Sequence, residues 1–287
     1  MKIELKRAIL NKYFLWGCIF GIIIIFLHSY SIVVEYNSVI PKIENAVIKG
    51  INPLAPTINV FTSWIGWNSE NKYSKLFFAL MPFISVIPYF WSYCDDIKKG
   101  KANVMIEKNG KFNYHLTKYF ATFISSGLTI AIPLLLDFLI LLLFVPAVFP
   151  DSVYDIYYGI FSNDFMANTF YTNPLLYVFV FLLLNFTYCG LFGCIGYSVS
   201  TLIKNKVISL IAPIVFILLT EFIKNKVISD VATQRNNFSP LTFLCPAKSI
   251  NTNWIIIILE IISLFIVTFY CSVLRYTKKD KNIEDKL

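Results

Sequence analysis

Long runs of uncharged, apolar residues recur along this 287-residue chain and limit what it can fold into. Each run has about twenty residues, the length at which an α-helix crosses a hydrocarbon core of about 30 Å. The composition agrees, because 57% of the residues are hydrophobic and only 15% are charged. A soluble protein of this size cannot bury so much apolar surface. The sequence therefore predicts an all-α, polytopic integral membrane protein.

The hydropathy pattern predicts six membrane-spanning helices. They are expected at residues 14–34, 76–94, 119–145, 175–203, 207–223 and 254–274. The first run is too long for a signal peptide, and no small-residue cleavage site follows it. We expect a single transmembrane domain over residues 1–287, with an external loop or subdomain at 35–75 and a cytoplasmic loop at 95–118. The last external loop is expected to dip part-way into the membrane around Pro240 and Pro246.

Lysine and arginine fall unevenly on the two sets of loops. The N-terminus, the 95–118 loop, the 204–206 junction and the run after Arg275 carry more of them than the opposite loops. Cytoplasmic loops retain positive charge, so both termini are expected in the cytoplasm. The net charge of +8 mainly reflects this topology. It is therefore no indication of a nucleic-acid partner.

The first dozen residues, MKIELKRAILNK, mix apolar and basic side chains, with Leu5 and Ile9 four positions apart. This spacing favours an amphipathic helix in the cytoplasmic membrane interface, with Lys6 and Arg7 towards headgroups or a partner. The alternative is a charged start that only sets the orientation of the chain.

Motifs for catalysis or for nucleotide binding are absent from the sequence. The eleven glycines form no phosphate-binding loop, because Met105 stands where the first glycine of a loop ending at Gly110-Lys111 would be needed. The two histidines, His28 and His115, cannot build a histidine-rich metal site. The six cysteines show no metal or redox spacing. We expect no enzyme activity and no cofactor or metal bound by this chain.

Polar and ionisable residues inside the predicted spans are candidates for a translocation path. They are His28, Asp137, Asn185, Glu221 and Glu260. Charge at membrane depth is costly, and such residues usually face a bundle interior or a wet cavity. Asp137, Glu221, Glu260 and His28 all fall towards the outer leaflet. The alternatives are that each pairs with a neighbouring helix or reaches the interface, or that they relay protons.

Glycines recur at short spacing within two of the predicted spans. Gly17 and Gly21 lie in the first, and Gly190, Gly193 and Gly196 lie in the fourth. Small residues at this spacing let helix backbones approach closely. These five glycines therefore predict helix packing, either within one bundle or in a dimer.

The polar segment CDDIKKGKANVMIEKNGK, from Cys94 to Lys111, separates the second and third predicted spans. Two carboxylates followed by lysines suit a helix start, because the N-terminal end of a helix favours negative charge. Ile97, Val104 and Met105 would share one face of a short helix in water. Three uses are compatible with this segment: a Mg²⁺ site with Glu107, contact with anionic lipid, or a surface for a soluble partner.

The same segment resembles the loop between spans two and three of ABC type-2 permeases, the membrane subunits of one class of ATP-binding-cassette exporters. The shared features are the acidic pair, a charged stretch with glycine (KKGK), two apolar residues (Met105 and Ile106), a basic cluster (KNGK) and Lys118 entering span three. GLTIAIPLLLDFLILLLFVPAVFP and SVSTLIKNKVISLIAP also look similar. The chain departs from the family pattern in its long first external loop and in Asp137, where a neutral polar residue is expected.

The resemblance implies a partner and a docking site. A separate ATPase dimer, which binds ATP and Mg²⁺, would dock on this loop and on the N-terminal helix, and a second permease copy or paralogue would complete the path. The implied docking residues are Asp95, Asp96, Ile97, Gly100, Val104, Met105 and Ile106.

The expected function is outward transport of a hydrophobic or amphipathic substrate, such as a peptide, an antibiotic or a lipid-like molecule. Two alternatives stay open: a carrier driven by an ion gradient, and a non-transporting immunity or sensor protein that binds peptides. The abundance of Ile, Lys, Asn, Phe and Tyr is typical of an AT-rich bacterial gene. We therefore expect the protein in a bacterial plasma membrane.

Overall fold

The computed structural model describes residues 1–50, 58–66, 71–158, 160–161, 164–224, 238–246 and 252–275. All the regular elements in these ranges are helices. Four are long and apolar enough to cross a membrane: α2 (Lys12–Ile48), α7 (Lys111–Phe144), α10 (Pro174–Ile203), and α13 (Trp254–Phe269) continued by the π-helical turn η4 (Tyr270–Leu274). The prediction of an all-helical fold is confirmed for the described residues, and so is the prediction of helices long and apolar enough to span a membrane.

Two of the six predicted spans contain shorter helices. They are α4 (Lys72–Val86) and α11 (Lys206–Phe222). At 1.5 Å per residue, α4 is about 22 Å long and α11 about 26 Å, both below the thickness of a hydrocarbon core. Six complete crossings therefore remain a prediction.

The predicted second span is interrupted after Val86. A short turn follows, and a separate helix, α5 (Ser92–Lys98), contains the end of the predicted span and Asp95 and Asp96. Pro88 lies in this turn. Proline has no backbone N–H to continue a helix and disfavours helical geometry in the preceding residue. The hydropathy pattern missed this break because the residues around it stay apolar.

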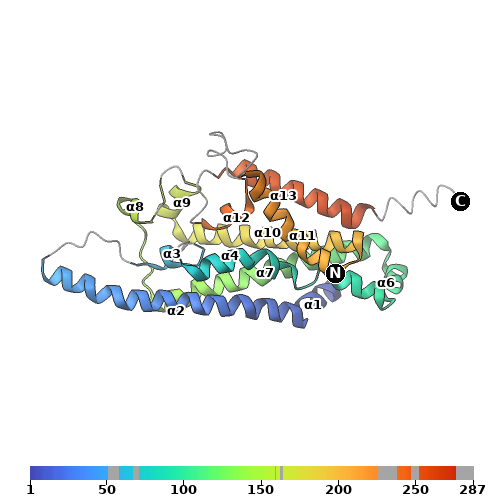
Figure 1. Ribbon diagram of the computed structural model, residues 1–287, viewed down its shortest axis with the longest axis horizontal. Helices are drawn as coiled ribbons and strands as arrows, with labels where there is room; N and C mark the ends of the chain where they lie inside the picture. Colours follow the sequence, from blue (N-terminus) through green and yellow to red (C-terminus); the bar gives the residue numbers. More distant parts are fainter. Residues whose placement is uncertain are drawn as a thin grey trace.

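The helix that contains the first predicted span, α2, runs further than predicted. α2 continues to Ile48, about 55 Å in all, and protrudes beyond the neighbouring helices (Figure 1). The first part of the predicted external loop is thus helical. Glu35 ends the apolar run, but glutamate is a good helix former, so it does not end the helix.

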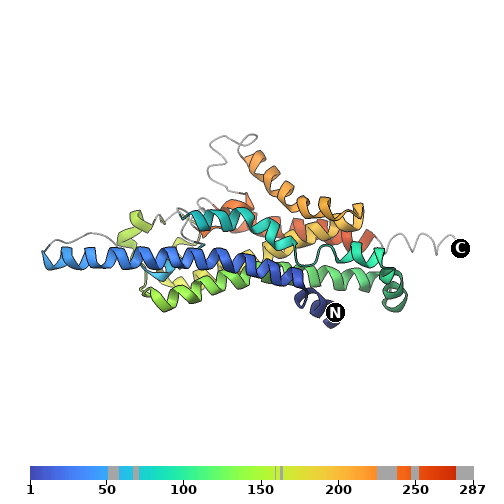
Figure 2. The ribbon, with the colours of Figure 1, turned by 60° about the horizontal axis from the view of Figure 1, so that its bottom comes forward.

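The long helices lie side by side around α7 and α10, which make the most extensive contact in the fold (Figure 1). α2 and α1 (Lys2–Ile9) pack on α7, whereas α4, α11 and α13 pack on α10. Figure 2 shows α11 leaning away from the axis of the other helices. The shared α7–α10 contact is therefore the centre that positions the remaining elements.

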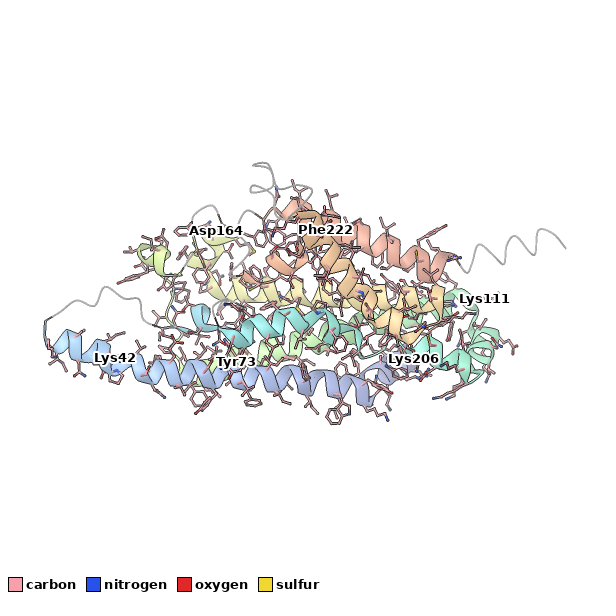
Figure 3. All side chains as sticks on the ribbon, in the orientation of Figure 1. Lys42, Tyr73, Lys111, Asp164, Lys206 and Phe222 are labelled. Atoms are coloured by element: carbon pink, nitrogen blue, oxygen red, sulfur yellow. The ribbon has the colours of Figure 1, made fainter. Side chains whose placement is uncertain are left out.

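The two ends of the bundle differ in character. At one end, termed the basic end, lie α1, α5 and α6 (Lys101–Asn109), and Figure 3 places Lys111 and Lys206 there. At the other, termed the cap end, lie α3 (Val60–Ser63), η1 (Ser152–Tyr154), α8 (Asp155–Tyr158), α9 (Ala167–Thr172) and α12 (Pro240–Phe243). The N-terminus, the 95–118 segment and the 204–206 junction, which the sequence assigns to the cytoplasm, thus gather at the basic end.

The predicted packing glycines lie at contacts within a single chain. A methyl group on Gly17 or Gly21 would come within 2.9 Å of Thr129 or 2.8 Å of Pro133 on α7. On α10, the corresponding closest atoms are Phe123 at 2.7 Å for Gly190, Ser126 at 2.0 Å for Gly193 and Val86 at 2.7 Å for Gly196. These five positions therefore let α2, α4, α7 and α10 approach one another closely.

Some sequence predictions fall outside the described residues. They concern residues 51–57 and 67–70 of the first predicted external loop, 225–237 and 247–251 of the last one, and the basic run after Arg275.

Candidate functional site

The predicted cytoplasmic loop folds as two short helices that return the chain to α7. α5 and α6 are joined at Gly100, and α6 ends at Gly110; their φ angles are 68° and 76°. Residues with a side chain avoid such angles, so glycine suits both turns. We term residues 92–110 the bracket. Gly100, one of the predicted docking residues, is the corner of this bracket.

Asp96 of the bracket is fully buried and binds two cations. Arg7 of α1 donates to both of its carboxylate oxygens, at 2.6 Å and 3.1 Å. Lys118 Nζ on α7 lies 2.7 Å from Asp96 Oδ2. The pairing with arginine is bidentate, the strongest geometry available to a carboxylate. One side chain therefore ties the bracket to both the N-terminal helix and a long helix.

Glu4 adds a second anion to this ion network. Its carboxylate accepts a hydrogen bond from Tyr89, and it lies 3.5 Å from Lys118 Nζ and 3.6 Å from Arg7 Nη1. Charges brought out of water are tolerated when they are paired and hydrogen-bonded. Glu4 and Asp96 together balance Arg7 and Lys118, so this set of charges is neutral as a whole.

Hydroxyl groups satisfy the remaining positions of the ion network. Tyr114 donates to Asp96 Oδ2 at 3.3 Å, and Lys118 Nζ donates to Ser92 Oγ at 3.2 Å. Burial raises the pKa of Asp96, but the hydrogen bond from Arg7 and the charge of Lys118 outweigh it and hold that pKa below its usual value. The carboxylate therefore stays ionised at neutral pH.

The network also fixes which face of α1 packs on the protein. Glu4 and Ala8 are buried, whereas Ile3 and Leu10 are 79% and 73% exposed. Arg7, which the sequence analysis directs towards headgroups or a partner, instead points into the network. This corrects the expected orientation of that side chain. An interfacial position for α1, with its apolar residues facing lipid, stays a prediction.

The other predicted docking residues differ in what they contact. Asp95 forms an ion pair with Lys206 at the start of α11. Ile97, Met105 and Ile106 are half-buried and pack on the apolar cluster around Tyr93, Ala102 and Tyr114. Val104 is 52% exposed. The outer surface of the bracket therefore includes Val104 as an exposed apolar residue and a rim of lysines, namely Lys98, Lys99, Lys101 and Lys108, with the polar residues Asn103, Glu107 and Asn109 between and beside them.

A cavity of about 530 Å³ lies between α1, α6 and α7 beside the ion network. Ile3, Glu4, Met105, Lys108 and Tyr114 are among its lining residues. The wall is partly apolar and partly charged, a combination that suits a protein side chain or loop. Across the ranges that the structure describes, no group of three or more His, Cys, Asp and Glu side chains is arranged to hold a metal.

Two of the predicted path residues contact each other at the cap end. Asp137 Oδ1 lies 3.0 Å from His28 Nδ1 and accepts a hydrogen bond from Ser29 at 2.8 Å. Its second oxygen accepts from the backbone N–H of Ile65 at 2.8 Å. His28 Nε2 is buried and has no hydrogen-bond partner among the residues that the structure describes. Asp137 thus pairs with a neighbouring helix, one of the alternatives left open by the sequence.

The remaining path residues contact other partners. Asn185 donates to the carbonyl of Leu244 at 3.1 Å, and Tyr188 donates to Glu260 at 3.2 Å. Glu221 accepts a hydrogen bond from Ser239. The structure brings His28 and Asp137 together but places each of the other three in a separate contact.

The ion network was not predicted from the sequence, although Asp96 and Lys118 were each singled out. A signal was present: opposite charges flank the predicted second and third spans at their basic ends, and a lysine next to an apolar run needs a counter-charge. Arg7 and Tyr89 carried no comparable signal.

Comparison of the chain with protein-family models, with curated proteins and with solved structures finds no match in any of the three.

Proposed function

We propose that this chain is the membrane-spanning subunit of an exporter of the ATP-binding-cassette type, with a separate ATPase docked at its basic end. The observation that carries the proposal is the bracket of residues 92–110 and its attachment through Asp96 to α1 and α7. An exporter subunit whose own sequence has no nucleotide-binding motif needs a surface through which a separate ATPase can act on it.

The bracket has the properties of such a surface. Val104 offers an exposed apolar anchor, and the lysine rim attracts acidic groups by long-range electrostatics. The adjacent cavity between Ile3 and Met105 accepts a side chain of the partner. The expected partner surface is therefore acidic, with an apolar residue that enters the cavity.

Force on the bracket has a direct route to the long helices. α6 continues into α7 through Gly110, and the Asp96–Lys118 pair links α5 to the same helix. The Asp96–Arg7 pair moves α1 along with it. A push on Val104 therefore tilts α7, and α7 is packed against α2 and α10.

In this proposal six helices cross a bacterial plasma membrane, and the basic end with both termini faces the cytoplasm. The distribution of lysine and arginine supports this orientation. The path lies between this chain and a second copy or a paralogue. Its apolar and aromatic character, with 17% aromatic residues, suits a hydrophobic or amphipathic substrate.

The experiment is ATP hydrolysis in the complex purified from the native membrane through a tag on this chain. A vanadate-sensitive ATPase is expected to co-purify, and Val104→Asp is expected to release it without lowering the melting temperature of the bundle. Val153→Asp is the matched control, because Val153 is 77% exposed and lies at the cap end in η1. Retention of the ATPase by Val104→Asp contradicts the docking surface.

A second candidate is a carrier driven by an ion gradient, favoured by the buried His28–Asp137 pair between two long helices. Ionisable pairs at membrane depth often carry protons in such carriers. Proteoliposomes with the purified chain alone distinguish the two functions. Flux driven by a pH gradient and abolished by His28→Gln supports the carrier; its absence, with ATP-dependent flux in the complex, supports the exporter.

A further inference from the structure

Two segments from distant parts of the chain fold back into the cap end. The first comprises residues 58–66 and contains α3, and the second comprises residues 238–246 and contains α12 (Figure 1). Val60, Ile65, Phe243 and Leu244 are fully buried. These segments are therefore packed among the long helices, not spread over their surface.

The first segment is held mainly by α7. The backbone N–H of Ile65 donates to Asp137, and Trp64 Nε1 donates to the carbonyl of Leu134 at 3.0 Å. At its start, the N–H of Val60 donates to the carbonyl of Pro146 at 3.1 Å. Of these three hydrogen bonds, only the one to Asp137 has a carboxylate as its acceptor. Hydrogen bonds to charged groups are stronger than those between neutral groups.

The Asp137 carboxylate is itself oriented by α2. Ser29 and His28 both contact its other oxygen, which leaves Asp137 Oδ2 directed at Ile65. α2, α7 and the first segment therefore meet at a single side chain.

The second segment is held by α10 and by α11, where Glu221 accepts a hydrogen bond from Ser239, and it meets the first segment. Asn185 of α10 donates to the carbonyl of Leu244, and the ring of Phe243 lies 5.2 Å from that of Tyr188. Cys245 Sγ lies 3.2 Å from the carbonyl of Gly66 and donates to it. The two segments thus touch each other at Gly66 and Cys245, the first bonded to α7 and the second to α10.

We propose that residues 58–66 and 238–246 form a two-part plug that closes the cap end of the chain, and that Asp137 is its latch. Several hydrogen bonds hold the plug, and the bond from Ile65 to Asp137 is the one that links the first segment both to α7 and, through Ser29 and His28, to α2. Movement of α7 against α2 separates Asp137 from its orienting groups and frees the first segment. The second segment then loses the Gly66–Cys245 contact and opens as well.

The role of the plug as an outer gate rests on the proposed transport function, but its latch is tested without a motor. Cys245 is a native reporter, because it is 2% exposed at the contact between the two segments. A variant that keeps Cys245 and replaces Cys18, Cys94, Cys189, Cys194 and Cys271 with alanine reports only on this contact. The probe is a small, charged methanethiosulfonate reagent applied to the purified chain.

Asp137→Ala in this background is expected to raise the labelling rate of Cys245 by about tenfold or more, since the lost bonds are to a charged group. Ser29→Ala removes only one orienting bond, so its rise is expected to be smaller than that of Asp137→Ala. Asp164→Ala is the matched control, because Asp164 also accepts a backbone N–H at the cap end, that of Phe161, but lies outside the plug. Its labelling rate is expected to equal that of the parent.

An unchanged rate in Asp137→Ala overturns the latch, as does an equal rise in Asp164→Ala. If Asp137→Ala does not fold, Ser29→Ala decides: faster labelling with an unchanged melting temperature supports the latch, and an unchanged rate overturns it. These measurements use the chain without ATPase. A positive result together with no co-purified ATPase would retain the latch and remove the proposed motor.

Discussion

Lys118 Nζ on α7 lies 2.7 Å from Asp96 Oδ2 on α5, and neither side chain exposes any surface. This pair joins the bracket to a helix long enough to cross a membrane. Arg7 and Glu4 complete it, so three separate segments meet around one buried set of charges. These charges therefore tie α1, α5 and α7 to one another at the basic end.

Asp96→Ala is expected to lower the free energy of unfolding by about 3–5 kcal/mol, because it leaves Lys118 buried without its closest carboxylate. Thermal or denaturant unfolding of the detergent-solubilised protein measures this loss. Asp95→Ala is the matched control. Its ion pair with Lys206 is partly exposed, so the expected cost is below about 1 kcal/mol. Equal losses for the two neighbouring aspartates would refute the buried network.

The stability of the basic end is expected to fall in acid. Burial raises the pKa of Asp96, but Arg7 and Lys118 outweigh it, so the folded pKa lies below the ordinary value of about 3.9. The unfolded chain then binds this proton more readily, and the carboxylate stabilises the fold above about pH 4. That contribution is lost as the pH falls from about 4 through the lower folded pKa. The free energy of unfolding, measured at neutral pH and near pH 3, should decrease more for wild type than for Asp96→Asn. Identical decreases in the two proteins would contradict Asp96 as the acid-sensitive group.

Arg7→Ala is expected to release α1 from the bundle. Two hydrogen bonds from Arg7 to Asp96 tie α1 to the bracket, and bonds to a charged group contribute about 1.5–3 kcal/mol. Trypsin cleavage after the exposed Lys6 should accelerate by about tenfold or more, because cleavage follows the population of the open form. Lys2→Ala, which changes an exposed cation of the same helix, should leave the rate of cleavage at Lys6 unchanged.

Hydropathy located the long helices because a membrane span is a local property of about twenty consecutive residues. It misplaced their ends where the local rule does not apply. α2 passes Glu35 because a charge ends an apolar run without ending a helix, and α4 stops at Val86 although the residues that follow stay apolar. The spacing of the glycines also predicted the structure correctly, since Gly193 and the neighbouring glycines on α10 all lie at close helix contacts.

The side-chain pairs could not be predicted in the same way. Arg7 and Asp96 are 89 positions apart, and His28 and Asp137 are 109 apart. A sequence shows that a buried charge needs a partner, but the partner is chosen by how the helices pack. Asp96 was therefore predicted to be part of a docking surface, whereas its carboxylate lies inside the protein. Asp137 was likewise predicted to line the translocation path, and in the structure it accepts a hydrogen bond from the backbone N–H of Ile65.

Gly193 has the least room for a side chain among the glycines of the described residues, and it gives the last prediction. A methyl group on Gly193 of α10 would lie 2.0 Å from Ser126 Oγ and 2.6 Å from Ser126 Cβ on α7. Gly193→Ala therefore forces α7 and α10 apart, and overpacking of this kind costs about 1–3 kcal/mol. Within the described part of the chain the Ser126 hydroxyl has no hydrogen-bond partner, so its removal breaks no polar contact there.

Ser126→Gly removes both clashing atoms and is expected to restore most of the stability that Gly193→Ala loses. The measurement is the melting temperature of the two single variants and of the double variant in the same detergent. Ser126→Gly alone is expected to cost about 1 kcal/mol, because it places glycine in a helix interior. A loss in the double variant equal to or larger than the sum of the two single losses would contradict the contact between Gly193 and Ser126.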